Sequence, residues 1–127
     1  MLISYNQSYE KIAMGLLSYI EDFKSVERLR EAMDNYIQSE DRTLYLWKDG
    51  ETENIVGIIG VEQSDVVVLV RHIAINPSFR QEGVVYQILD KLQTRFPDLA
   101  INGTLETVPL ITKWAQKNNQ LDNTVCE

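Results

Sequence analysis

Cysteine and histidine are almost absent from this sequence. Its 127 residues include one cysteine, Cys126, and one histidine, His72. A lone cysteine cannot form an internal disulfide, and the two residues together are too few for a cysteine-rich or histidine-rich zinc site. We therefore expect no metal, and we interpret Cys126 as an inert thiol near the end of the chain.

Long apolar runs are missing as well. No stretch approaches the ~20 apolar residues that a membrane-spanning helix needs. The opening residues, Met1 to Tyr5, lack the basic stretch and apolar run of a secretory signal. These absences predict no membrane partner and a cytoplasmic location.

No Gly/Ser-rich or Pro-rich linker divides the chain, which contains six glycines and three prolines. With 44% apolar and 24% charged residues, the composition is ordinary for a folded chain of this length. We expect a single domain over residues 1–127, with a polar tail from about residue 119.

Basic residues are fewer than acidic ones, 12 Lys+Arg against 19 Asp+Glu, which gives a net charge of −7. An acidic chain repels a polyanionic backbone, so we expect no nucleic-acid partner. Much of the acid lies in the first half, whereas Arg71, Arg80, Lys91 and Arg95 lie in the second. We expect the second half to receive any small anionic ligand.

The start of the chain predicts a short strand over residues 2–5 and two amphipathic helices. The first helix follows Ser8, which we expect to cap its first turn, and the second follows Ser25 and ends by residues 39–41. The first apolar stripe contains Tyr9, Ile12, Ala13, Leu16 and Ile20, and the second contains Val26, Leu29, Met33, Tyr36 and Ile37.

Three strands are predicted next. Residues 43–47 and 54–61 flank the turn residues Lys48-Asp49-Gly50 and indicate an antiparallel hairpin. Residues 66–75 form the most apolar run in the chain. Such unbroken β-branched sequence is typical of a strand covered on both faces, so we expect this strand to be central.

Asn76-Pro77 ends that strand, and a helix is expected from Gly83 to Pro97. A short strand at 99–101 and a last helix starting near Thr107 complete the pattern. The order β-α-α-β-β-β-α-β-α predicts an α/β (α+β) fold with a mixed, mostly antiparallel central sheet flanked by helices.

The segment from Ile73 to Val85 runs from the apolar strand through a polar loop into a helix. A helix start presents unpaired N–H groups and the positive end of the helix dipole, so it can hold a phosphate. Gly83 would let a ligand approach the backbone closely, and Arg80 could add a forked donor. The pattern alone also fits a plain connection between two elements.

This strand, Pro77, Arg80, Gly83 and the helix after them resemble the acetyl-CoA segment of the GCN5-related N-acetyltransferases, the GNAT family. The family pattern is a hydrophobic strand, then R/Q-x-x-G-x-G/A, then a helix. The order of the other elements also matches that family. The resemblance is greatest to a small subgroup found with bacterial riboflavin-biosynthesis genes, on residues 12–18, 44–48 and 71–73, although no flavin-binding motif is visible.

The resemblance implies acetyl-CoA as co-substrate. It places pantetheine along Ile73, Ala74 and Ile75, with a further polar contact from Asn102, and it places the pyrophosphate around Arg80, Gln81, Glu82, Gly83, Val84 and Val85. Val85 stands where the family has a second glycine or alanine, and its branched side chain would narrow the pyrophosphate site. Glu82 places a negative charge where a basic residue is common.

Acetylation of an amine needs a route for the amine proton and usually a donor to the leaving thiolate. Many members of the family use a tyrosine of the last helix as donor, and Thr112 is its nearest equivalent here. His72 and Glu62 are the candidate bases, and the ordinary histidine pKa of ~6.5 suits proton transfer. Both also suit structural roles, Glu62 as a solvated strand end and His72 as a hydrogen-bonded strand histidine.

The resemblance therefore implies an N-acetyltransferase that acts on an amine of a small molecule or protein by direct attack in a ternary complex. Family members usually carry two more strands after the last helix, so we expect a C-terminally shortened sheet and a possible homodimer through its exposed edge. The alternative is a catalytically weak or inactive member of this fold that senses CoA or binds a protein partner. Release of CoA in the presence of amines distinguishes the two.

Overall fold

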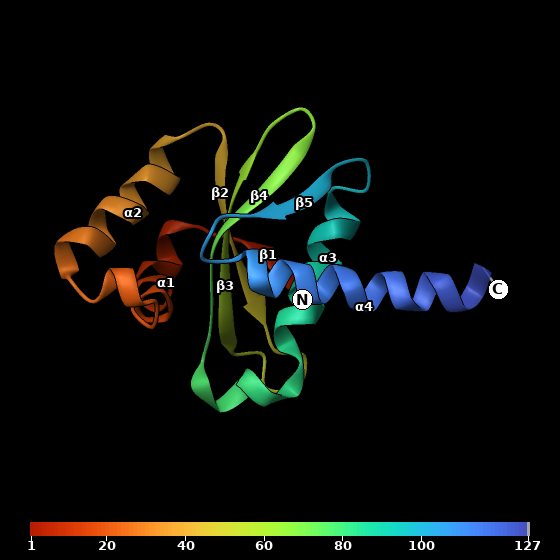
Figure 1. Ribbon diagram of the computed structural model, residues 1–127. Coiled ribbons are helices and arrows are strands. Elements are labelled where there is room, and N and C mark those ends of the chain that lie inside the picture. The colour runs from red at the N-terminus through yellow and green to blue at the C-terminus, as the bar shows by residue number, and fades with distance from the viewer. Residues whose placement is uncertain (127) are drawn as a thin grey trace.

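Five strands form one sheet in the order β1-β2-β3-β4-β5 (Figure 1). All neighbours are antiparallel except β4 and β5, which are parallel. The strands are β1 (Leu2–Ser4), β2 (Arg42–Lys48), β3 (Ile55–Gln63), β4 (Val67–Ile75) and β5 (Ala100–Gly103). This computed structural model describes residues 1–126, with the side chains of all but residues 81, 82 and 118–126.

Helices cover both faces of the sheet (Figure 1). On one face α1 (Glu10–Leu17) and α2 (Val26–Gln38) pack on side chains such as Leu46 and Ile58. On the other, α3 (Val84–Arg95) and α4 (Val108–Cys126) pack on side chains such as Ile59 and Val68. Short 3₁₀ segments, η1 (Gln7–Tyr9), η2 (Glu21–Phe23) and η3 (Pro77–Glu82), join these elements. The predicted fold class and element order are confirmed.

The expected polar tail begins inside α4, and the side chains of its residues 119–127 lie outside those described. This applies to Cys126 as well. Within the described residues, no helix combines the length and the apolar character needed to cross a membrane.

The prediction of a central β4 is wrong, because β3 is the middle strand of the sheet. All residues of β3 from Val56 to Val61 are buried. In contrast, Val66, which was expected in β4, precedes that strand and is 75% exposed. The apolar run therefore marked the neighbour of the central strand. The two glycines of β3 lowered its apolar count while giving room to large side chains from other elements.

The predicted apolar stripes of the first two helices are each rotated slightly. Ile12, Val26 and Ile37 are 39%, 65% and 57% exposed. The other predicted positions within these helices, Ala13, Leu16, Leu29, Met33 and Tyr36, are buried, and Leu17 in α1 and Ala32 in α2 are buried with them. The expected cap is also different, because Asn6 Oδ1 accepts the Ser8 N–H at 2.9 Å and Ser8 caps nothing in α1.

A β-bulge interrupts the pairing of β3 with β4. Gly60 lies opposite His72 and Val61 lies opposite Val70, so Arg71 is the extra residue. A bulge shifts the alternation of side chains by one position. Val70 before the bulge packs on the α3/α4 side, whereas His72 after it reaches α2. The bulge therefore turns the only histidine toward the α1/α2 face.

Candidate functional site

The strands β4 and β5 pair only as far as Val70 and Gly103. Beyond this point, no strand in the described part of the chain pairs with the β5-side edge of β4. Side chains bond the carbonyls at both ends of this free edge: Thr107 Oγ1 donates to Val70 O at 2.7 Å, and Arg80 Nε donates to Ile75 O at 3.3 Å. Between them, the backbone of residues 71–74 is open to an extended ligand.

Three neighbouring cavities follow this free edge and form a groove. The first, about 340 Å³, lies between Arg80, Val85 and Leu110. The second, about 330 Å³, shares Ile73 and Leu110 with the first. The third, about 370 Å³, shares Asp22 and His72 with the second and ends against α2. The groove thus runs from the start of α3, along β4, to η2 and α2.

The start of α3 combines the features expected of an anion site. Gly83 precedes the helix in the left-handed conformation, with φ of +71°, and a Cβ there would meet no atom within 4 Å. No side chain among those described caps the first turn of α3. The Arg80 guanidinium lies 5.7 Å from the ring centre of Tyr19, which holds it at this end of the groove. The backbone here can therefore be approached closely, and none of the described side chains bonds the N–H groups of the first turn.

The predicted cofactor residues lie in different parts of this arrangement. Ile73, Ala74, Ile75, Arg80 and Val85 line the first cavity. Val84 turns its side chain into the core, where it is 5% exposed, and only its backbone can face a ligand. Gln81 and Glu82 belong to η3 through their backbone, and their side chains lie outside those described.

His72 is enclosed by aromatic groups from two elements. Its Nδ1 lies 2.5 Å from the hydroxyl of Tyr36, and the ring of Phe23 lies 4.8 Å away, centre to centre. The strand opposite provides the room, since a Cβ on Gly60 would lie 2.2 Å from the Tyr36 hydroxyl. The prediction of a hydrogen-bonded strand histidine fits this environment.

Burial lowers the pKa of His72 to about 4, and the charges of Arg71 and Arg42 act in the same direction. Burial also raises the pKa of Tyr36, so its hydroxyl keeps its proton at neutral pH. When the Tyr36 hydroxyl donates to Nδ1, the ring proton lies on Nε2 and neither ring nitrogen has a free lone pair to accept another proton. The geometry therefore argues against His72 as the base.

Glu62 is bound to two arginines. Its Oε1 accepts from Arg71 Nε at 2.5 Å and lies 3.5 Å from Arg42 Nε. The hydrogen bond from Arg71 lowers the pKa of Glu62, which weakens it as a base. Glu62 also lines none of the three groove cavities. Its observed role is to hold two arginines beside the groove.

Thr112 and Asn102 are exposed, and neither lines a cavity of the groove. Thr107, one turn earlier than Thr112, is the α4-side hydroxyl that reaches β4. The sequence showed Thr107 only as the start of a helix. Thr107 bonds the carbonyl of Val70 at the point where β4 and β5 separate, and no local pattern in the sequence predicts where these strands separate.

Three acidic side chains that the sequence analysis did not select also line the groove: Asp22 of η2, Glu106 before α4 and, in the third cavity, Glu31 of α2. Hydrogen bonds, chiefly from its own backbone and from Thr104, lower the pKa of Glu106. Asp22, Glu31 and Glu106 are exposed, so their carboxylates can attract a cationic group from solvent. Within the described residues, no group of three acidic, histidine or cysteine side chains could hold a metal ion.

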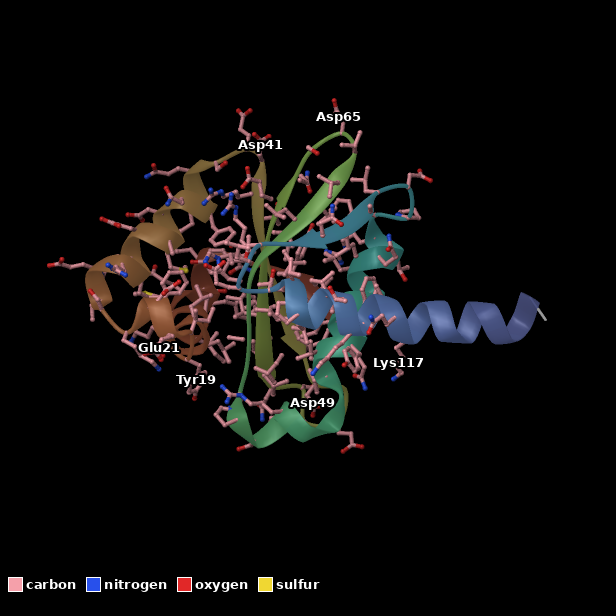
Figure 2. The ribbon with its side chains drawn as sticks, in the orientation of Figure 1. Tyr19, Glu21, Asp41, Asp49, Asp65 and Lys117 are labelled. Carbon is pink, nitrogen blue, oxygen red and sulfur yellow. The ribbon has the colours of Figure 1, made fainter. Side chains whose placement is uncertain are left out.

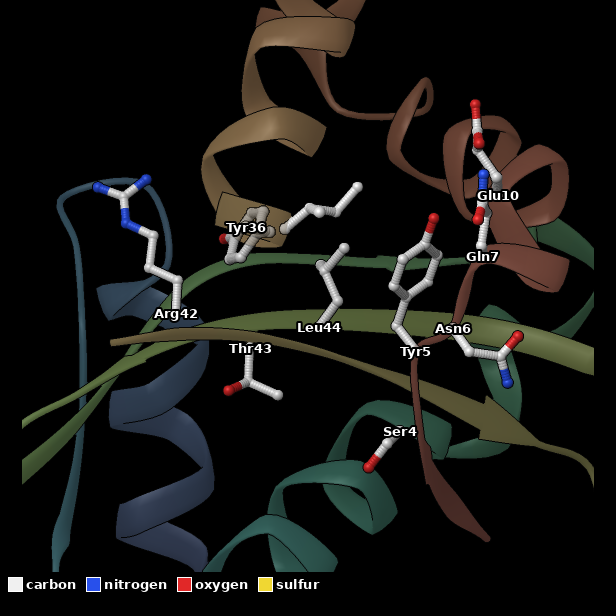
Figure 3. A pocket seen from close by; sticks show the side chains of 10 residues that line it. Ser4, Tyr5, Asn6, Gln7, Glu10, Tyr36, Arg42, Thr43 and Leu44 are labelled. Carbon is white, nitrogen blue, oxygen red and sulfur yellow. The ribbon is translucent and has the colours of Figure 1, made fainter. Parts of the chain in front are cut away.

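A separate cavity of about 500 Å³ lies at the opposite edge of the sheet, where β1 ends (Figure 3). Arg42 and Glu10 lie at its two ends with Tyr5 between them. The Tyr5 hydroxyl is buried and has no hydrogen-bond partner among the described residues. Tyr36 and Arg42 line both this cavity and the α2 end of the groove, but none of the predicted site residues lies here.

Comparison with known sequences supports the family that the sequence resembles. The model of a family described as "Acetyltransferase (GNAT) family" matches residues 13–117. An "Uncharacterized N-acetyltransferase in lysA 3'region" of Bacillus methanolicus is 40% identical over 114 residues, which cover 89% of this chain and 93% of that protein.

Solved structures share the fold at low sequence identity. AAC(6')-Iy in complex with the bisubstrate analogue CoA-S-monomethyl-acetylneamine is 15% identical, with a TM-score of 0.70 over 93% of this chain and 87% of that chain. A spermidine N-acetyltransferase chimera from Vibrio cholerae and hSSAT is 14% identical, with a TM-score of 0.66 over 92% of this chain and 79% of that chain.

Proposed function

This chain belongs to the GNAT family of acetyltransferases, and from that premise we propose that it transfers an acetyl group from acetyl-CoA to an amine by direct attack in a ternary complex. The observation that carries the proposal is the free edge of β4. This edge leads from the start of α3 to the second cavity of the groove, which contains Asp22, Arg71 and Glu106. Such an edge offers backbone groups to an extended pantetheine chain, and a helix start offers N–H groups to a pyrophosphate.

The residues at the first cavity suit CoA. The backbone around Gly83 would receive the pyrophosphate, Arg80 would stand beside it, and Ile73 to Ile75 would face the pantetheine. Structures with this fold have been solved with CoA or a CoA analogue bound, which supports the assignment. The Val85 side chain faces the same cavity and leaves less room than glycine or alanine would.

We propose a cationic small-molecule amine as acceptor. Asp22 and Glu106 line the middle of the groove together with Arg71, and Arg42 lines its third cavity. Glu62 pairs with both arginines and offsets their charges. Acidic side chains such as Glu21, Asp41 and Asp65 project outward elsewhere on the surface (Figure 2), in keeping with the net charge of −7. Proteins with this fold carry names that include aminoglycoside and spermidine, which are cationic amines. The link to riboflavin-biosynthesis genes stays a prediction.

An inactive, CoA-sensing or protein-binding member of the family is the second candidate. It is favoured by Val85 in the cofactor cavity and by the position of Thr112, which faces away from the groove. In an active enzyme the amine proton would have to leave through water rather than through either predicted base.

The first test is binding of acetyl-CoA by calorimetry to the wild type and to Gly83→Asp. An aspartate at position 83 would adopt a strained left-handed backbone and place a negative charge at the pyrophosphate site, so we expect binding to fall at least about tenfold. Gly50→Asp is the matched control, because Gly50 lies in a turn and a Cβ there also meets nothing within 4 Å. Equal affinity in all three proteins would contradict this location of the site.

A panel of amines then separates the two candidate functions. With saturating acetyl-CoA, an acetyltransferase releases free CoA thiol only when a suitable amine is present. Thiol release with polyamines or aminoglycosides supports the enzyme. Tight cofactor binding with no release for any amine supports the sensing or binding protein instead.

A further inference from the structure

The hydroxyl of Tyr36 reaches from α2 across the sheet to the histidine of β4. Three independent features hold this arrangement: Arg71 bulges and turns His72 toward α2, Gly60 leaves the space that the hydroxyl occupies, and Phe23 packs on the imidazole ring. Because these groups pack closely around the His72 ring, the ring has one orientation. The Tyr36–His72 pair is therefore a fixed part of the groove.

The direction of the hydrogen bond between Tyr36 and His72 decides the tautomer of the imidazole. A protonated phenol has one hydrogen to donate, and the only bond recorded for the Tyr36 hydroxyl within the described chain is to His72 Nδ1. If the phenol donates to Nδ1, the imidazole proton must lie on Nε2. No described residue bonds Nε2, and His72 lines both the middle and the α2 end of the groove. With the phenol as donor, His72 presents an N–H group where the two cavities meet.

We propose that His72 serves acetyl transfer as a fixed hydrogen-bond donor through Nε2, with Tyr36 and Gly60 as the residues that position it. The inference rests on the proposed function. When the amine nitrogen attacks the thioester carbon, its lone pair forms the C–N bond and negative charge develops on the carbonyl oxygen. His72 Nε2–H donates to that oxygen. The C–S bond then breaks, the electron pair leaves on sulfur, and the ammonium proton passes to water.

The charges around His72 favour a neutral donor over a charged one. The charges of Arg71 of β4 and Arg42 of β2 lower the pKa of His72, and those of Glu106 before α4 and Asp22 of η2 raise it by less than burial and the arginines lower it. The arginines are themselves bound to Glu62. Because the ring is also buried against Phe23 and Tyr36, the neutral form persists across the physiological pH range.

Nuclear magnetic resonance tests the tautomer directly, because the chain contains one histidine and its ring signals need no assignment. We expect long-range ¹⁵N–¹H spectra to show the Nε2–H tautomer unchanged from pH 8 to about pH 5. Tyr36→Phe should free Nδ1 and raise the histidine pKa. Tyr9→Phe, which removes another hydroxyl near the same core cluster, should leave the spectrum unchanged. An Nδ1–H tautomer, or titration near pH 6.5 in the wild type, overturns the proposal.

Kinetics test the role in the reaction. His72→Ala should lower kcat about 10²-fold, the loss typical of one donor to a developing oxyanion, with little change in the KM for acetyl-CoA. His72→Gln places an amide N–H near the position of Nε2 and should recover at least about tenfold of that loss. If acetylation by His72→Ala equals that of the wild type, the donor role is wrong while the proposed function stands. If no amine is acetylated by the wild type, both fail.

Discussion

At the scale of single residues, Glu62 fixes the positions of two arginine side chains at the groove. Its carboxylate joins Arg71, the bulged residue of β4, to Arg42 of β2. The side chains are 25% to 35% exposed, so each ion pair is screened by water and worth no more than about 1 kcal/mol. Together they hold in place two flexible side chains that line the groove, Arg71 in its second cavity and Arg42 in its third.

We predict that Glu62→Gln lowers the free energy of unfolding by about 0.5–1 kcal/mol at pH 7. The folded-state pKa of Glu62 lies below its usual 4.5, so its contribution to stability is present above that pH. The contribution is lost as pH falls through the folded pKa. Urea titrations of both proteins at pH 7 and pH 3 should therefore show a difference that disappears at the lower pH.

The same variant separates a structural role for Glu62 from a role as base. We expect Glu62→Gln to retain acetyl transfer within about tenfold and to keep the shape of the pH–rate profile. Loss of a basic limb in that profile would instead identify Glu62 as the proton acceptor.

The sequence could identify His72 as a strand histidine but could not reveal its partner. Tyr36 fell on the apolar stripe of α2, and a buried position was expected for it, which is correct. Its contact with His72 depends on the one-residue shift at Arg71 and on the missing side chain of Gly60. A pattern of period two along β4 cannot show such a shift, because the bulge is a property of the paired strands.

At the scale of elements, α1 carries a glycine that nothing in the fold requires. Gly15 lies in the last turns of this helix, is exposed, and would place a Cβ in open space. Glycine in a helix costs stability because the unfolded chain is unusually free at that residue. Gly15 therefore lowers the helix propensity of α1, although no contact of this helix requires a glycine at that position.

We predict that Gly15→Ala raises the free energy of unfolding by about 0.5–1 kcal/mol. Gly103→Ala, at the end of β5, is the contrasting variant. Its Cβ would lie 2.6 Å from Thr107 Oγ1 and 2.9 Å from the backbone nitrogen of Val108, so we expect a loss of stability there. Thermal or urea unfolding measures both, and a destabilised Gly15→Ala would mean that α1 needs glycine at this position.

Element type and order could be read from the sequence because each segment carried its own periodicity and end signals. The position of each strand in the sheet could not. The strand with the strongest apolar run is β4, yet β3 is the middle strand because it pairs with β2 on one side and β4 on the other. Its glycines leave room for Tyr36 on one face and for Ile75 and Ile88 on the other. Apolar content indicates burial, whereas strand order depends on which strands pair.

At the scale of the whole molecule, two opposing properties govern self-association. The strand β5 lies at one edge of the sheet, with only β4 beside it among the described residues. An unpaired edge offers N–H and C=O groups to a second strand. Against this, every copy carries a net charge of −7, so two copies repel each other.

We predict a weak homodimer through this edge whose stability increases with ionic strength. The edge of β5 is only four residues long, which limits the contact and places the dissociation constant in the micromolar range or weaker. Salt shortens the Debye length from about 14 Å at 0.05 M to about 4 Å at 0.5 M and so removes most of the repulsion. In light scattering at fixed protein concentration, the average mass should then rise from 14.7 kDa toward twice that value. A mass that stays at the monomer value at both salt concentrations would contradict the dimer, and a mass that falls with salt would point to an interface held by ion pairs rather than by a strand edge.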